Sequence, residues 1–168
     1  RLAERNIRLS SANSINIGRL FPQVAYYVST YVSLVDNGAI SEGETFDVIV
    51  PTGNFGNILA GYFAKKMGVP IGKLICASNQ NKVLADFFET GVYDMNRDFY
   101  TTDSPSMDIL LSSNFERFLF YVAKEDAAKV AQWEKDLLET GKMSVSADEL
   151  KTLRQEFEGG WIDDDETK

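Results

Sequence analysis

The sequence predicts an α/β fold, a partial three-layer α/β/α arrangement around a parallel sheet, followed by a mainly helical portion. Two β-branched, apolar runs are each followed by a helical pattern: residues 46–50 precede a helix over 58–67, and residues 74–78 precede a helix over 83–90. This strand–helix–strand–helix order is typical of parallel sheets, because parallel neighbours need a long crossover, which is usually a helix. A glycine-containing loop over 51–57 separates the first strand from its helix.

A long amphipathic helix is predicted ahead of the first strand, over about 14–35. Its apolar residues recur at helical spacing, and Asn13 or Ser14 can cap its N-terminus. Asn37-Gly38 suits its end, where a left-handed residue is common. Pro22 falls inside the run and predicts either a kink or a boundary one residue earlier, because proline removes a backbone donor.

The second half of the chain is predicted to contain one short strand and then helices. Residues 99–102 are the candidate third strand, and Ser146 with Glu149 has the spacing of a capping box. Residues 159–166 are predicted to be a loop and a charged tail. The predicted helices of this half cover 107–111, 115–124, 127–140 and 147–157.

We therefore expect an α/β portion over 1–103 that carries the loop, and a mainly helical portion over 104–168. Two or three strands are few for a parallel sheet, whose faces both need cover and whose strands need neighbours. The sequence is accordingly expected to be an excerpt of a longer protein.

Composition excludes several classes of function. The chain has 17 basic and 25 acidic residues, a formal net charge of −8, which argues against nucleic acid or an anionic membrane as partner. It has no histidine, so Ser-His-Asp and histidine-ligated zinc sites are excluded within it, and no metal site is predicted. The single cysteine, Cys76, lies in an apolar run and is expected to be a buried thiol. We expect a cytoplasmic protein.

The loop after the first strand is predicted to bind phosphate. Gly53 and Gly56 allow close approach of an anion, and Asn54 and Asn57 tolerate turn conformations and can donate hydrogen bonds. The helix that follows presents free N–H groups and the positive end of its dipole, at the edge where open α/β sheets bind ligands. The loop lacks the Walker and dinucleotide patterns. Spacing alone leaves a ligand-free glycine turn as the alternative.

Three ordered segments resemble threonine synthases. Residues 51–61 resemble the segment with which that family binds the phosphate of pyridoxal phosphate. Residues 11–16 resemble its segment that opens a long helix near the active site. Residues 104–109, together with 112–117, resemble its stretch after the next crossover. The likeness spans roughly residues 10–124.

The resemblance implies a fold-type II pyridoxal-phosphate lyase of threonine biosynthesis, which converts O-phosphohomoserine and water into threonine and phosphate. It implies that the cofactor phosphate binds at Gly53, Asn54, Phe55, Gly56 and Asn57. It places the small-molecule substrate near Asn13, Ser14, Asn16, Ser104 and Ser106. Helix capping and turn formation are the alternative roles of these five polar residues.

The cofactor lysine of the family lies upstream, in a Ser-Phe-Lys-Asp-type context that this sequence lacks. Lys65 and Lys66 lie in the helix after the loop and Lys73 just before the next strand, so none is a substitute. We therefore expect a fragment that is inactive by itself, with no catalytic residue of its own and without bound pyridoxal phosphate. Apolar surface exposed on such a fragment predicts a homo-oligomer.

Two other interpretations stay open. One is a non-catalytic α/β module that binds a phosphorylated small molecule. The other is part of a different fold-type II lyase, such as a serine or threonine dehydratase. Those enzymes usually carry a more glycine-rich phosphate loop, so Asn54-Phe55 disfavours them.

Overall fold

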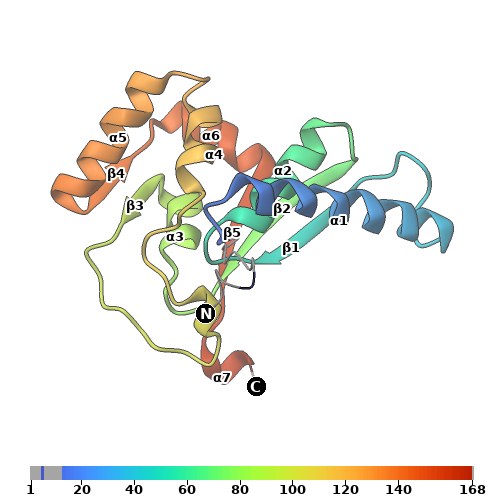
Figure 1. Cartoon of the computed structure of the whole chain (residues 1–168), viewed down its shortest axis with the longest axis horizontal. Helices are drawn as coiled ribbons and strands as arrows, with labels where there is room; N and C mark the ends of the chain where they lie inside the picture. The colour runs from blue at the N-terminus through green and yellow to red at the C-terminus, as the bar shows by residue number, and fades with distance from the viewer. Residues whose placement is uncertain (1–4, 6–12, 168) are drawn as a thin grey trace.

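A three-stranded parallel sheet lies at the centre of the structure, in the order β1–β2–β5 (Figure 1). The strands are β1 (Phe46–Pro51), β2 (Ile71–Ser78) and β5 (Phe157–Trp161). The computed structural model describes residue 5 and residues 13–167. The helix α2 (Gly56–Lys66) connects β1 to β2, which confirms the strand–helix–strand unit predicted from the sequence.

The third strand of the sheet is not the predicted one. Residues 99–102 form a loop, whereas β5 lies in the segment expected to be a loop and tail. Its two glycines lower the strand propensity of that segment. The structure gives a reason for one of them, because a Cβ at Gly159 would lie 2.6 Å from the carbonyl oxygen of Ala85. Glycine therefore lets β5 approach α3 (Val83–Thr90) closely.

The long first helix, α1, spans Ile17–Asp36. Its N-cap is Asn16, whose side chain accepts a 2.8 Å hydrogen bond from the N–H of Gly18, so the caps predicted at Asn13 and Ser14 are wrong. The helix continues through Pro22, and the predicted boundary is also wrong. Proline in the second turn removes a single backbone hydrogen bond, which packing of α1 on α2 outweighs. The end of α1 at Asn37-Gly38 is confirmed, since Gly38 has a positive φ of 68°.

Mainly helices follow the second strand. This part of the chain also contains a short antiparallel pair of strands, β3–β4, separate from the central sheet. The sequence pattern did not predict this pair, because each strand has only three residues. The capping box of Ser146 and Glu149 is confirmed. The elements are β3 (Val92–Asp94), η2 (Pro105–Met107), α4 (Phe115–Val122), α5 (Ala127–Thr140), β4 (Lys142–Ser144), α6 (Ala147–Glu156) and α7 (Asp164–Thr167).

The helix predicted over 107–111 is absent. Only the short 3₁₀ turn η2 forms there, and Asp108 leaves the helical conformation with a ψ of 74°. Its carboxylate accepts hydrogen bonds from the preceding loop, so side-chain contacts determine the backbone path here. The predicted division of the chain at residues 103 and 104 stays a prediction.

A cluster of aromatic rings joins the sheet to the helices. Phe55 lies at its centre, only 1% exposed, and its ring centroid is 5.2–6.2 Å from those of four other phenylalanines. Such ring pairs stabilise a core beyond the area that they bury. The four partners of Phe55 are Phe88, Phe115, Phe118 and Phe157. The loop after β1 is thereby attached to the core from within.

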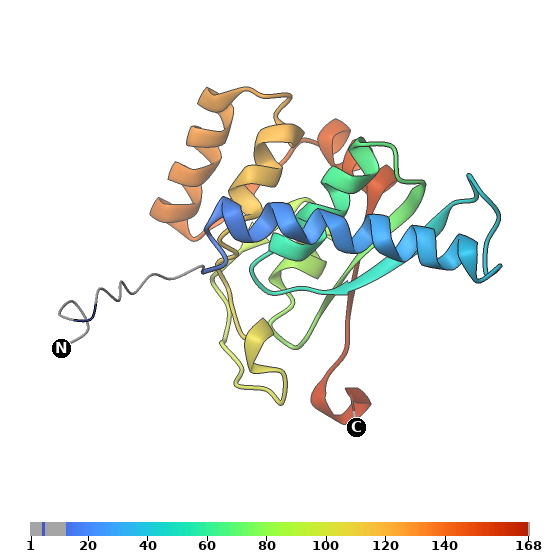
Figure 2. The ribbon, with the colours of Figure 1, turned by 45° about the vertical axis from the view of Figure 1, so that its right-hand side comes forward.

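The helix α1 lies along the outside of α2, with α4 and α5 beyond its N-terminal end (Figure 2). The helix α1 carries exposed apolar side chains, including Phe21 at 60% exposure. The self-association predicted from the sequence stays a prediction. Cys76 is fully buried, as predicted, and burial raises the pKa of its thiol to about 12. In the described part of the chain, no helix is both long and apolar enough to cross a membrane.

Candidate functional site

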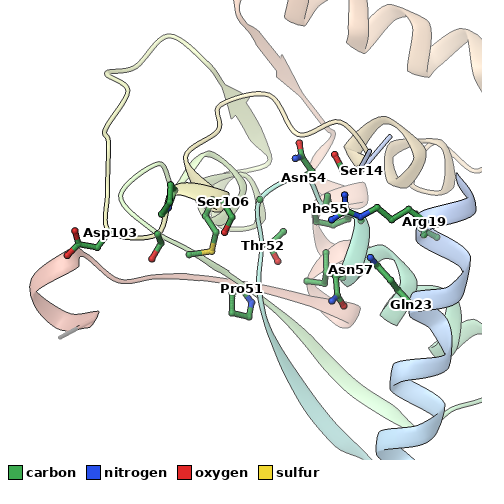
Figure 3. Close-up of a pocket in the computed structure, with 17 residues that line it drawn as sticks. Ser14, Arg19, Gln23, Pro51, Thr52, Asn54, Phe55, Asn57, Asp103 and Ser106 are labelled. Atoms are coloured by element: carbon green, nitrogen blue, oxygen red, sulfur yellow. The ribbon is translucent and has the colours of Figure 1, made fainter. Parts of the chain in front are cut away.

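A cavity of about 590 Å³ opens at the carboxyl end of β1 (Figure 3). Three segments line it: the start of α1, the loop between β1 and α2, and the loop that contains η2. These segments are far apart in the sequence, and the fold brings them together at the edge where α/β sheets bind ligands. The lining residues used below are Ser14, Arg19, Gln23, Thr52, the loop 53–58, Asp103, Ser104 and Ser106.

The first turn of α2 provides the donors of this cavity. Phe55 precedes the helix in the left-handed conformation, with a φ of 61°, and no side chain caps it. Within the described part of the chain, the backbone N–H groups of residues 53–58 donate to no protein acceptor. Unpaired N–H groups at a helix start, aligned with the helix dipole, favour an anion such as phosphate.

The carbonyl groups of the same loop are held from the opposite side. The Ser112 hydroxyl donates to the oxygen of Gly53 at 2.8 Å. The backbone N–H and the side-chain amide of Asn114 donate to the oxygen of Asn54 at 3.1 and 2.9 Å. The Ser113 hydroxyl donates to the Asn54 Oδ1 at 3.2 Å. Since the acceptors of residues 53 and 54 are engaged, the loop has donors to offer a ligand.

Asn114 connects three parts of the site. It is completely buried, and its Nδ2 also donates to the carbonyl oxygen of Ser14 at 2.7 Å. The guanidinium of Arg117 donates to its Oδ1 and, at 2.7 Å, to the oxygen of Ile15. A buried amide with all these partners fixes the segment before α1 against the loop after β1.

Glycine is required where the loop meets η2. A Cβ at Gly53 would lie 2.5 Å from the carbonyl oxygen of Ser106, a backbone atom that has little freedom to move. This close approach places residues 104–106 beside the loop 53–58. The contact of Ser104 and Ser106 with a substrate stays a prediction.

The predicted site residues are only partly brought together. All five loop residues line the cavity, but the ring of Phe55 lies in the core, so this residue contributes its backbone. Ser14, Ser104 and Ser106 line the cavity too. Asn13 and Asn16 are not among the lining residues, and Asn16 caps α1 instead. Residues 11 and 12 of the same motif lie outside the described residues.

Two residues of α1 that line the cavity were not predicted from the sequence. Arg19 and Gln23 reach from α1 toward the loop, and Arg19 is the one basic residue among the described lining residues (Figure 3). The Oε1 atom of Gln23 is buried and, in the described structure, has no hydrogen-bond partner. A signal was available, because these two residues lie four apart and share one helix face.

A network of buried polar side chains fixes the loop that leads to η2. Asn79, at the end of β2, donates to the Thr102 hydroxyl at 2.8 Å and to Asp108 at 2.7 Å. Asn81 donates to the oxygen of Tyr100 at 2.8 Å. The Thr102 N–H donates to the Asp108 carboxylate at 3.0 Å. Burial by itself raises the pKa of Asp108, but the hydrogen bonds from Thr102, Asn79 and Asn81 outweigh it and lower the pKa below its usual value.

The stability that Asp108 contributes should disappear in acid. A carboxyl group whose pKa is lowered by folding stabilises fully above its unfolded-state pKa of about 3.9, and the contribution is lost as the pH falls through the folded-state pKa. We expect Asp108→Asn to lower the free energy of unfolding by a constant amount from about pH 5 to pH 7, and the difference from wild type to shrink below about pH 4. Urea unfolding of both proteins at a series of pH values measures this, and a pH-independent difference would contradict it.

The fold and this cavity together define an α/β protein with a candidate anion site at the carboxyl edge of a parallel sheet. No family model matches the sequence. The chain is 50% identical over 159 residues to "Threonine synthase-like 1" of Homo sapiens, an alignment that covers 94% of this chain and 21% of the relative. The predicted resemblance to threonine synthases is thereby confirmed.

Two solved structures of threonine synthases are similar to this chain. The structure of pyridoxal-phosphate-bound threonine synthase from Brucella melitensis superposes with a TM-score of 0.82 at 45% identity, over 92% of this chain and 32% of that chain. The yeast threonine synthase gives a TM-score of 0.85 at 38% identity, over 98% of this chain and 33% of that chain. The predicted fold class, part of a fold-type II α/β architecture, is confirmed. The chain spans between about a fifth and a third of the length of these relatives.

Proposed function

We propose that this chain forms the cofactor-phosphate anchor and part of the substrate pocket of a threonine synthase. Such an enzyme is a pyridoxal-phosphate-dependent lyase that converts O-phosphohomoserine and water into threonine and phosphate. The observation that carries the proposal is the first turn of α2, whose free N–H groups line a cavity of about 590 Å³. The similarity to a threonine synthase solved with pyridoxal phosphate bound supports it.

The residues of the loop fit the phosphate of pyridoxal phosphate. Residues 53–58 provide backbone donors at a helix start, and Gly53 and Gly56 leave room for close approach. Phe55 anchors this turn in the core, so the donors do not need to reorganise when the anion binds. When bound, pyridoxal phosphate supplies an electron sink for carbon-acid chemistry, and the protein holds and orients it.

Other residues that line the same cavity suit a second phosphate, that of the substrate. Arg19 lines it together with Ser14, Ser104 and Ser106. Arginine binds phosphate through a planar pair of N–H donors, and serine hydroxyls donate to the remaining oxygens. We assign these residues to O-phosphohomoserine. Asn13 and Asn16 stay predictions for the same role.

A lysine has to be added to this site from elsewhere in the enzyme. No lysine is among the described residues that line the cavity. Lys65 and Lys66 contact Glu156 of α6 at 2.8 and 3.0 Å, and Lys73 donates to the carbonyl oxygen of Arg154. The chain by itself is therefore proposed to be inactive and to lack stably bound pyridoxal phosphate. The cytoplasmic location and the homo-oligomer predicted from the sequence also stay proposals.

Ligand binding and turnover by the full-length protein test the proposed function. We expect pyridoxal phosphate to bind and pyridoxal, which lacks the phosphate, to bind at least about 100-fold more weakly, because several charge-assisted hydrogen bonds are lost. Inorganic phosphate should compete with the cofactor, and O-phosphohomoserine should yield threonine. Phosphate-dependent binding without release of threonine would favour the non-catalytic phosphate-binding module instead.

A further inference from the structure

We propose that Tyr27 is a positioning residue for the phosphate loop: it holds the side-chain amide of Asn57 so that the N–H donor end faces the cavity. The inference rests on the proposed function of the loop as a phosphate site. The two residues are far apart in the sequence, because Tyr27 lies on α1 and Asn57 in the first turn of α2.

The Tyr27 hydroxyl is within hydrogen-bond distance of both oxygen atoms of Asn57. The Tyr27 hydroxyl lies 2.5 Å from the Asn57 Oδ1 and 3.0 Å from the carbonyl oxygen of Asn57. A hydroxyl has one proton, and the shorter contact receives most of it. The oxygen end of the amide is therefore engaged by α1, and Nδ2 is the end left for the cavity that Asn57 lines. In the described part of the chain, the Asn57 side chain accepts from Tyr27, and its Nδ2 donates to no protein acceptor.

The Tyr27 hydroxyl is well suited to fix this orientation. Tyr27 is only 5% exposed, and burial raises the pKa of its hydroxyl far above the usual value. The group therefore stays protonated at neutral pH and remains a donor to Asn57. The reverse orientation would place the amide oxygen next to the phosphate, where it would repel the anion.

Close packing of α1 on α2 makes the contact possible. A Cβ at Gly61 would lie 2.7 Å from two ring atoms of Tyr27 and 3.0 Å from Leu74. Glycine is unfavourable in a helix interior, and its presence in α2 is explained by the ring that occupies this space. The ring contact fixes the distance between the helices, and hence the distance from the hydroxyl to Asn57.

Tyr27 is the third member of a row of polar residues on α1. Arg19, Gln23 and Tyr27 lie four residues apart and therefore share one face of the helix, which lies along the first turn of α2. Arg19 and Gln23 line the cavity, and the buried Oε1 of Gln23 has no partner in the described structure. A buried polar atom without a partner, beside the loop, is an independent sign that a ligand belongs there.

A double-mutant cycle in the full-length protein tests the inference, with inorganic phosphate as probe and the dissociation constant as readout. We expect Asn57→Ala, which removes one charge-assisted donor to the phosphate, to weaken binding by at least about 10-fold. Tyr27→Phe, which removes only the orientation of that donor, should weaken binding about 10-fold. In the double variant, Tyr27→Phe should cause no further loss, because it acts only through Asn57. Thermal unfolding of each variant shows that the fold is retained.

Tyr31→Phe is the matched control. Tyr31 lies one turn further along α1, and its hydroxyl accepts a 2.8 Å hydrogen bond from the N–H of Gly43, away from the cavity. Tyr31→Phe loses the same hydroxyl oxygen as Tyr27→Phe, together with its hydrogen bond to Gly43. Its phosphate affinity should equal that of the wild type. Nitrogen-15 spectra give a second readout: the Asn57 side-chain amide should show a single restrained environment in wild type and an averaged one in Tyr27→Phe.

Two results would overturn the positioning role alone, and a third would overturn it together with the proposed function. Unchanged phosphate affinity of Tyr27→Phe, beside a weakened Asn57→Ala, would show that the tyrosine does not orient the amide. Additive losses in the double variant would show that Tyr27 acts through general stability. Absence of phosphate binding by the wild-type protein would reject the proposed function itself, and the positioning role with it.

Discussion

Replacement of Phe55 by alanine should lower the free energy of unfolding by about 3–5 kcal/mol, the range measured for buried phenylalanines. Phe55 is 1% exposed and contacts the rings of four phenylalanines that come from two helices, α3 and α4, and from β5. Its loss leaves a cavity where the sheet, the loop and α4 meet. Denaturant unfolding followed by circular dichroism measures the effect.

The same substitution should also weaken the phosphate site, because Phe55 is the residue from which α2 begins. Phe99→Ala is the matched control: Phe99 is 55% exposed, and its replacement should change the free energy of unfolding by less than about 0.5 kcal/mol. A loss below about 1 kcal/mol for Phe55→Ala would contradict the central position of this ring in the core.

The second large effect is expected at Gly53, in ligand binding more than in stability. A Cβ placed there would lie 2.5 Å from the carbonyl oxygen of Ser106, so Gly53→Ala forces the loop and residue 106 apart. Displacement of a binding group by about 1 Å can reduce function by about 100-fold, and we expect a loss of that size in phosphate affinity. Isothermal titration with inorganic phosphate measures it.

Gly160→Ala is the control for this prediction. A Cβ at Gly160 meets nothing within 4 Å, so the same change of residue type should leave phosphate affinity unaltered. If Gly53→Ala bound phosphate as tightly as wild type, the contact between the loop and η2 would not determine the geometry of the site.

Local patterns were sufficient to predict the part of the fold that surrounds the site. Alternation of strand and helix predicted β1, α2 and β2, and helical spacing gave α3 and α5 with the bounds observed. These elements carry their own start and stop signals, such as Gly91 and Gly141 with positive φ at the helix ends. Their structure depends little on distant residues.

Elements that depend on distant contacts could not be predicted. The strand β5 contains Gly159-Gly160 and forms because β2 offers a parallel partner, not because its own sequence favours a strand. The loop over 99–102 has strand-like composition, yet Asn79 and Asp108 hold it as a loop. Tertiary hydrogen bonds outweigh local propensity in both places.

The candidate site shows the same division. Glycines and a following helix were enough to predict the place of the loop that lines the cavity, because its donors belong to the backbone; its binding of phosphate stays a prediction. Asn114 and Arg19 were missed as parts of the site, since their roles arise from contacts with residues distant in sequence. The spacing of Arg19 and Gln23 on one helix face was the available signal, whereas the contacts of Asn114 could be found only from the fold.

The pairing of β2 with β5 also determines the order in which the nascent chain can fold. The unit β1–α2–β2 is complete once residue 78 is available, whereas Leu74 pairs with Phe157, which the ribosome adds only after the whole helical part. At roughly 5–20 residues per second, synthesis of that part takes several seconds. During this interval one edge of β2 stays unpaired and the ring of Phe55 lacks its contact with Phe157. Until β5 is added, this unpaired edge of β2 exposes the newly made chain to misassociation with other strands.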